Sequence, residues 1–323
     1  MVGIRRLTGA SYRTGEGVDK VECKVKKKRQ PIADKVLQRI EKEMKRDVID
    51  LSSVRAGKKQ AADLQATIKA DDFAELPPAY AVYMWVQNQI TITAEQLLGL
   101  KAMYKFADVI EESQELYTPM GPPISPITAS YYSFWSLFDV AFGLGKETLG
   151  SVAIAVSRRL GAHNVFIELA TKMAESRCGV YQIVSSEQGL ITVKELWTQE
   201  EIIARNASGY NGEVGEIWYT RIFPPNELEQ GVSVVANTPY VMYQTSVAGW
   251  MKYFDDVLDK GGNKQSNDGY HDHMKYGDGH FYWPEYIFEA YVNHTSSHIF
   301  SKGLPNIPES RPHSELYQEY KTW

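Results

Sequence analysis

The chain has very little cysteine and no long hydrophobic run. Its 323 residues include two cysteines, Cys23 and Cys178, which lie far apart and outside any CxxC pattern. This scarcity excludes a disulfide framework and a cysteine-ligated zinc site, and it favours a reducing, cytoplasmic location. The N-terminus has no apolar stretch of signal-peptide length, and the most apolar segment, SFWSLFDVAFGLG, is short and contains Asp139. We therefore expect a cytoplasmic protein that has no membrane segment.

The common signatures of catalysis and nucleotide binding are missing as well. No HExxH, GxSxG or GxGxxG pattern occurs, so the usual zinc-protease, serine-hydrolase and dinucleotide sites have no support. The segment GLGKETLG, residues 143–150, matches a phosphate loop only in part. Val140 stands where that loop needs its first glycine, and Glu147 stands where serine or threonine should follow the lysine. We interpret this segment as a turn between helices.

The chain does contain enough apolar material for a packed core. Hydrophobic residues make up 43% of the sequence and charged residues 23%, a balance typical of globular proteins and unlike that of disordered ones. A length of 323 residues corresponds to two or three compact units. We therefore expect a globular protein built from more than one structural unit.

Positive charge is concentrated near the N-terminus. Residues 1–46 contain fourteen lysines and arginines against six acidic residues, whereas the whole chain has a net charge of −5. The densest part lies in a basic N-terminal arm, residues 1–30, which can bind phosphates through counterion release. The alternative is a solvated arm that packs on the acidic surface of the protein itself. The candidate nucleic-acid-binding residues are Lys24, Lys26, Lys27, Lys28 and Arg29.

Helical periodicity predicts an all-helical N-terminal domain over residues 31–176. Apolar residues recur every three or four positions from Ile32 to Val48, directly after a proline that is suited to the first position of a helix. Towards the end of this domain, Gly161 separates two further predicted helices and acts as a stop between them. Those two helices are predicted at residues 146–159 and 162–176.

The middle of this domain is predicted to hold two separate helices. Residues 79–90 are apolar enough for a short buried helix, although their β-branched and aromatic content leaves a strand as the alternative. A new helix is then predicted to begin at Thr93, because Thr93 and Gln96 have the spacing of a capping box.

The sequence pattern changes abruptly at Cys178. Six short β-rich runs follow, separated by turns that carry Gly, Asn, Pro or Ser. This pattern predicts a small antiparallel β-barrel or sandwich over residues 178–243, and hence an α+β fold. The six runs are GVYQIV, LITVKEL, EEIIAR, GEIWYTRIF, GVSVVA and PYVMY.

Residues 165–245 resemble the compact β-module that accompanies SEC-C motifs in uncharacterised bacterial proteins. The resemblance rests on the start at Val180 and Tyr181, the strand LITVKEL, the segment GEIWYTRIFPP and a closing strand. The cysteine-rich SEC-C segment itself is absent from this chain. The resemblance implies a fold for this module and no known activity.

The remainder is predicted to be a helical C-terminal extension, residues 246–302, followed by an extended tail, residues 303–323. One helix of the extension ends before Gly261, and Gly261 begins a polar, histidine-rich loop at 261–282. A second helix is predicted from Pro284 to about Phe300.

This extension holds most of the histidine of the protein. His294 and His298 are four positions apart on the predicted helix and can reach one ion, while His271 and His273 share a face if their loop is extended. Two such pairs can bind zinc or another divalent transition metal. The alternative is an ordinary solvated connection. The candidate metal ligands are His271, His273, His280, His294 and His298.

Three functional hypotheses follow. The leading one is a cytoplasmic bacterial binding or scaffold protein that interacts with another protein and has no identifiable catalytic centre. The second is a metal-dependent hydrolase, in which the histidine-bound ion activates water and Asp272 or Asp278 accepts its proton. The third is a nucleic-acid-binding protein that uses the basic arm and the barrel. Only the second hypothesis requires a cofactor, and that cofactor is the metal ion.

Overall fold

The computed structural model describes residues 30–44, 75–117, 126–143, 145–187, 189–206, 209–242, 245–260 and 267–276. The chain divides into two units after Gln30, and every other described residue belongs to the unit Pro31–Trp323. The basic arm, the helix predicted from Pro284 and the predicted tail all lie outside the described residues. Of the helices that are described, none combines the length and the apolarity that a membrane span needs.

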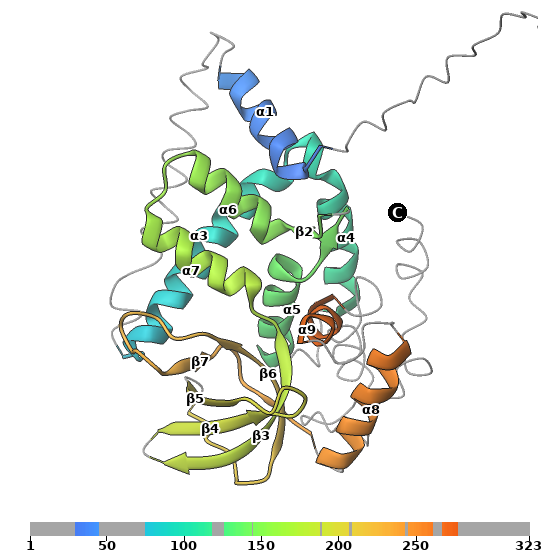
Figure 1. Ribbon diagram of the computed structural model, residues 1–323. Helices are drawn as coiled ribbons and strands as arrows, with labels where there is room; N and C mark the ends of the chain where they lie inside the picture. Colours follow the sequence, from blue (N-terminus) through green and yellow to red (C-terminus); the bar gives the residue numbers. More distant parts are fainter. Residues whose placement is uncertain are drawn as a thin grey trace, which may run out of the picture. The chain divides into compact units, whose positions relative to one another are not determined.

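The described residues between Pro31 and Ser176 are mainly helical (Figure 1). A two-stranded antiparallel ribbon, β1 (Ala141–Phe142) and β2 (Glu147–Thr148), interrupts the helices, so the prediction of an all-helical domain is wrong there. The end of segment 143–150 belongs to β2 and to the start of the next helix. The helical elements are α1 (Ile32–Met44), α3 (Pro78–Leu98), η2 (Lys101–Met103), α4 (Tyr104–Tyr117), α5 (Pro126–Phe138), α6 (Leu149–Arg159) and α7 (Asn164–Glu175).

The helix start predicted at Thr93 is wrong. Helix α3 runs without interruption from Pro78 to Leu98, and the Thr93 hydroxyl donates to the carbonyl of Gln89 at 2.9 Å inside it. The chain leaves the helix only at Leu100, which is extended. Packing explains the difference, because a buried stripe continues past Thr93 at helical spacing and outweighs the weak helix propensity of the β-branched residues. That stripe consists of Ala79, Tyr83, Val86, Ile90, Ala94 and Leu97.

The boundary between α6 and α7 follows the sequence closely. A capping box begins α6: the Thr148 hydroxyl accepts from the Ser151 N–H at 3.1 Å, and the Ser151 hydroxyl accepts from the Thr148 N–H at 2.8 Å. Gly161 has a φ of 85° between the two helices, which confirms the predicted stop, since glycine adopts this conformation without strain.

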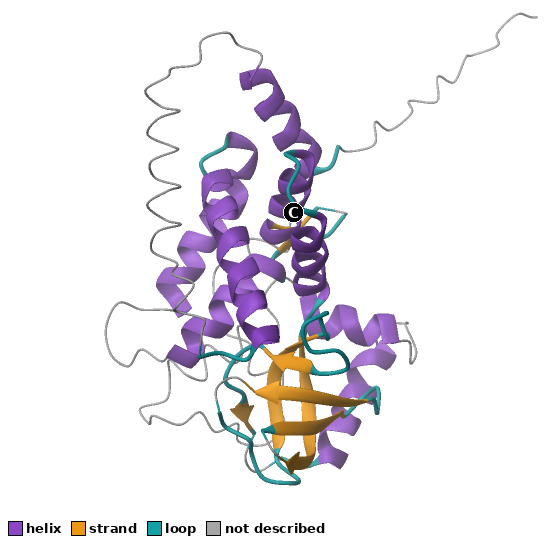
Figure 2. Cartoon of the chain, turned by 90° about the vertical axis from the view of Figure 1, so that its left-hand side faces the viewer, coloured by secondary structure: helices purple, strands orange, loops and turns teal. Residues whose placement is uncertain are grey.

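The β-rich region forms a closed five-stranded barrel, which confirms the barrel and excludes the sandwich (Figure 2). The ring runs β3–β4–β5–β7–β6 and returns to β3, while the short β8 pairs with β6 beside β7. All pairs are antiparallel except β5 with β7, which is parallel. The strands are β3 (Cys178–Glu187), β4 (Leu190–Glu195), β5 (Glu201–Asn206), β6 (Ile217–Phe223), β7 (Ser233–Val235) and β8 (Tyr240–Val241).

The two faces of the barrel strands pack into two different cores. Alternate residues of each strand form one apolar cluster, which includes Tyr181, Ile183, Trp218 and Ile222 and fills the barrel. Residues of the other face, such as Tyr219, join the larger core that the helices share. The barrel is therefore packed against the helices through one outer face.

Two helices follow the barrel, α8 (Val247–Lys260) and α9 (Asn267–Tyr276). The first confirms the helix predicted before Gly261, but α9 occupies part of the predicted loop at 261–282, so that prediction is wrong there. Tyr270 is fully buried in α9, and its ring centroid lies 5.1 Å from that of Phe254 in α8. This packing outweighs the low helix propensity of the Gly, Asn, Asp and His residues in α9.

Candidate binding site at the barrel mouth

The predicted histidine cluster is described only in part. His271 and His273 lie on α9, where residues two apart are about 160° apart around the helix axis, so the expectation that they share a face is wrong. His273 is buried, and its Nε2 lies 3.2 Å from the hydroxyl oxygen of Tyr253. His280, His294 and His298 lie outside the described residues. Within the described ranges, no three His, Cys, Asp or Glu side chains are grouped closely enough to hold a metal ion.

The basic candidate residues also fall outside the described part of the chain. Lys24, Lys26, Lys27, Lys28 and Arg29 all precede Gln30, the first residue described. Phosphate binding by the arm and metal binding by the full histidine set therefore stay predictions, and with them the hydrolase and nucleic-acid hypotheses.

The structure places a cleft of about 520 Å³ at one end of the barrel, a size within the usual range for ligand sites. This end, the barrel mouth, is where β3, β5 and β7 begin and where β4 and β6 finish. Tyr181 and Ile222, which belong to the barrel interior, form its apolar floor. The C-terminal turn of α7 forms one wall with Glu175 and Ser176, and Pro224 follows β6 on the rim.

The start of β5 borders this cleft with an incompletely paired edge. Glu201 pairs with β4, but the pairing of β5 with β7 begins only at Ala204, opposite Ser233. The Glu195 N–H donates to the Glu200 carbonyl at 2.9 Å. In an antiparallel strand, successive residues direct their backbone N–H and C=O groups to opposite neighbours. Because Glu200 bonds to β4, the N–H and C=O of Glu201 point away from β4 and toward the cleft.

Negative charge dominates the rim of the cleft. Glu175, Glu200 and Glu201 are exposed and line it, and no ion pair to any of these three carboxylates is found in the described part of the chain. Lys172 is the cation among the lining residues, and its ammonium already lies 2.8 Å from Glu168 on the same helix. The cleft therefore presents apolar surface bordered by carboxylates that form no ion pair with the described residues.

A buried ion pair lies at the same end of the barrel, where β3 begins and β4 finishes. Arg177 binds Glu195 through two hydrogen bonds of 2.6 and 3.0 Å, and its guanidinium stacks 4.5 Å from the ring centroid of Tyr270. Burial lowers the pKa of Arg177, but the hydrogen bonds and charge of Glu195 more than compensate and raise that pKa above its ordinary value. A Cβ at Gly179 would meet the Glu195 carboxylate and the Tyr181 ring at 2.6 Å, so glycine is required beside this pair.

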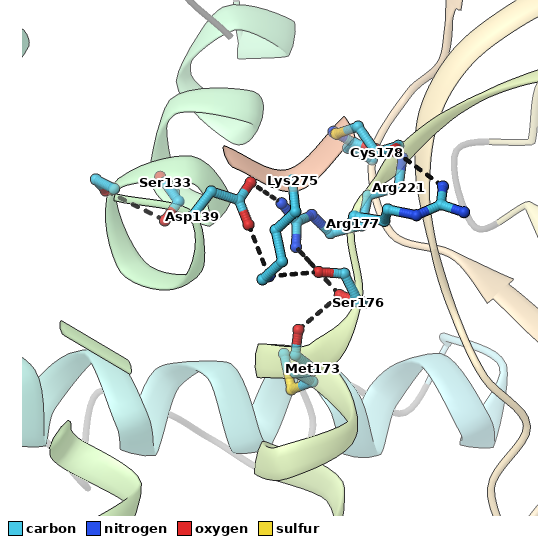
Figure 3. Close-up of polar contacts among 10 residues, drawn as sticks. Ser133, Asp139, Met173, Ser176, Arg177, Cys178, Arg221 and Lys275 are labelled. Atoms are coloured by element: carbon cyan, nitrogen blue, oxygen red, sulfur yellow. Dashed lines mark hydrogen bonds and ion pairs between the residues drawn. The ribbon is translucent and has the colours of Figure 1, made fainter. Parts of the chain in front are cut away.

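A second buried cluster includes Ser176, which also lines the cleft (Figure 3). Asp139, which follows α5, accepts from Lys275 of α9 at 3.0 Å and from Arg221 of β6. The Ser176 carbonyl accepts from the same two cations, at 2.7 Å from Lys275 and 2.9 Å from Arg221. Ser176 therefore belongs both to the cleft wall and to this cluster, and the buried charges fix its backbone in place.

The chemistry of this cluster indicates a structural role. Burial, more than the neighbouring charge of Arg221, lowers the pKa of Lys275 to about 8, while Asp139 opposes the shift. Burial also raises the pKa of the Cys178 thiol, which keeps it protonated and unreactive near neutral pH. The cluster therefore holds the backbone of the cleft wall at Ser176 in place.

Sequence reasoning did not select these residues. Asp139 and Arg221 each stand inside an apolar run of the sequence. A charged residue in such a run is a signal of a buried ion pair, because buried charges are usually paired. The cleft residues gave no such signal, since the ends of the strands come together only when the barrel closes.

Comparison of the chain with protein-family models, with curated proteins and with solved structures finds no match. The resemblance of residues 165–245 to the module of SEC-C-associated proteins therefore stays a prediction.

Proposed function

We propose that this protein is a protein-interaction module that binds an extended segment of a partner protein at the barrel mouth. The observation that carries the proposal is the position of the cleft, which lies along the edge of β5 where pairing with β7 has not yet begun. An extended peptide bound there would add to the sheet as a further strand. Partners recognised in this way gain affinity from backbone hydrogen bonds and specificity from pockets for alternate side chains.

Two features of the cleft support strand addition. The backbone N–H and C=O of Glu201 turn toward the cleft, and an edge strand with available groups is a ready template for another strand. The floor at Tyr181 and Ile222 is apolar and continues into the barrel core, so it can bury an apolar side chain of the added strand. The fixed backbone at Ser176 limits the ordering that binding requires.

The experiment uses Ile203→Pro, which removes one backbone N–H from the open edge of β5. Ile203 lies two residues after Glu201, so its backbone N–H also points away from β4. Its removal breaks no hydrogen bond to β4, and the sheet should tolerate the change. Random peptides displayed on phage would be selected on the wild-type protein, and the enriched peptides measured against both proteins by fluorescence anisotropy. We expect enriched peptides to bind the wild type and to lose most of their affinity for the variant.

The matched control is Ile202→Val, which trims the neighbouring side chain and keeps every backbone group. It should bind the enriched peptides nearly as well as the wild type does, and circular dichroism should give the same spectrum for all three proteins. The proposal is overturned if no peptide is enriched, or if the enriched peptides bind the folded Ile203→Pro variant as tightly as the wild type.

A further inference from the structure

The charge of the cleft points to the chemistry of the partner, an inference that rests on the function proposed above. We infer that the segment bound at the β5 edge is basic, with lysine or arginine at alternate positions and apolar residues between them. Glu175, Glu200 and Glu201 border the cleft without a counter-charge from any residue that the structure describes, and Lys172 is held by Glu168. An acidic or neutral segment would leave the three carboxylates unpaired or opposed by like charge.

The alternation follows from the two sides of β5. Ala204 and Ile202 belong to the face that packs into the barrel interior, whereas Glu201 and Ile203 are exposed on the outer face. Side chains of a strand added beside β5 must alternate in the same way, since neighbouring strands of a sheet share their pleat. One set would lie over the floor at Tyr181 and Ile222, and the other set would lie beside Glu201.

This geometry assigns a different residue type to each set. The inward set meets an apolar floor and should be β-branched or otherwise apolar, because an uncompensated charge there would be desolvated. The outward set lies in solvent beside the carboxylates, where lysine and arginine can pair with them and where their long stems cover exposed Ile203. Pairs of this exposed kind are individually weak and salt-sensitive, so recognition depends on several of them acting together.

The test compares four fluorescent peptides of equal length on the full-length protein. The first alternates Lys and Val, the second Ser and Val, the third Glu and Val, and the fourth groups the lysines and valines of the first into two blocks. We expect the Lys–Val peptide to bind best, the Ser–Val peptide about tenfold more weakly, and the Glu–Val and block peptides more weakly still. Added salt should reduce the advantage of the Lys–Val peptide over the Ser–Val peptide.

Variants of the protein locate the effect. Glu200→Gln combined with Glu201→Gln should remove most of the preference for Lys–Val over Ser–Val, measured as the ratio of the two affinities. The control is Glu187→Gln combined with Glu213→Gln, which removes two exposed carboxylates that do not line the cleft and should leave the preference intact.

The outcomes separate the inference from the function on which it rests. Equal binding of the Lys–Val and Ser–Val peptides, both lost in Ile203→Pro, would overturn the basic partner and leave strand addition standing. Equal binding of the alternating and block peptides would reduce the effect to general charge attraction and overturn the alternation. Failure of all four peptides to bind the wild type, together with no enrichment from the phage library, would overturn the function as well.

Discussion

The ammonium of Lys275 lies 3.0 Å from the carboxylate of Asp139, a residue 136 positions earlier in the chain. Both side chains are almost completely buried, and Arg221 pairs with the same carboxylate. One anion thus balances two cations, and removing it should have a much larger effect than removing either of its partners.

This asymmetry predicts the order of stability of two variants. Asp139→Asn leaves the charges of Lys275 and Arg221 buried without an anion and should lower the free energy of unfolding by about 3–5 kcal/mol. Lys275→Met keeps the pair of Asp139 and Arg221 and should cost about 0–2 kcal/mol. Urea denaturation measures both. The control is Asp255→Asn on the exposed surface of α8, which should leave the free energy of unfolding nearly unchanged. Equal losses of unfolding free energy in Asp139→Asn and Lys275→Met would contradict the role given to Asp139.

The lowered pKa of Lys275 predicts a pH dependence of stability. Its pKa is about 8 in the folded protein against an ordinary value of 10.5, so between these values the unfolded chain binds more protons than the folded one. The contribution of Lys275 to the free energy of unfolding should therefore rise as the pH increases from about 8 to about 9.5, by about 1–2 kcal/mol. The raised pKa of Cys178 acts in the opposite direction, so the rise is measured as the difference in unfolding free energy between the wild type and Lys275→Met. Denaturation in buffers across this range should give the same rise when Lys252→Met, which changes an exposed lysine of α8, replaces the wild type in this comparison. A difference that stays constant with pH would exclude the role given to Lys275.

Gly179 is predicted to be intolerant of any side chain. A methyl group there would lie 2.6 Å from the Glu195 carboxylate and the Tyr181 ring, both buried, so Gly179→Ala should destabilise the protein by about 1–3 kcal/mol. At Gly99, after α3, the nearest atom to an added Cβ is 3.9 Å away and the backbone is right-handed helical. Gly99→Ala should therefore be neutral or slightly stabilising. Thermal melting of the two variants checks the contrast, which fails if both melt at the same temperature.

A buried hydroxyl forms two hydrogen bonds between α5 and the barrel. Tyr131 donates to the Tyr219 carbonyl at 2.5 Å and accepts from the Tyr240 N–H at 3.3 Å. Tyr131→Phe removes both hydrogen bonds while keeping the ring, and should lower the free energy of unfolding by about 1–3 kcal/mol. Tyr104→Phe changes an exposed tyrosine and should have little effect. A loss no larger than that of Tyr104→Phe would mean that the hydroxyl is dispensable.

The barrel was predictable because its signal is local. In β4 the apolar residues alternate with polar ones, and Ile191 and Val193 point into the barrel as that alternation requires. Helix α9 was not predictable in this way, because its residues favour loops. Tertiary contacts stabilise the helix, such as those of Tyr270 with α8 and the barrel end. The cleft could not be predicted from the sequence for a related reason. Tyr181 and Glu201 line the same cavity only after the strands have paired.

The position of Lys275 in the chain has a consequence for protein synthesis. Lys275 is translated after Asp139, Ser176 and Arg221. During elongation, Asp139 and Arg221 can therefore pair before the ammonium of Lys275 is present. The wall of the cleft gains the hydrogen bond from Lys275 to the Ser176 carbonyl only after α9 has been synthesised. A nascent chain that stops short of α9 therefore lacks one of the two cations that hold this carbonyl in place.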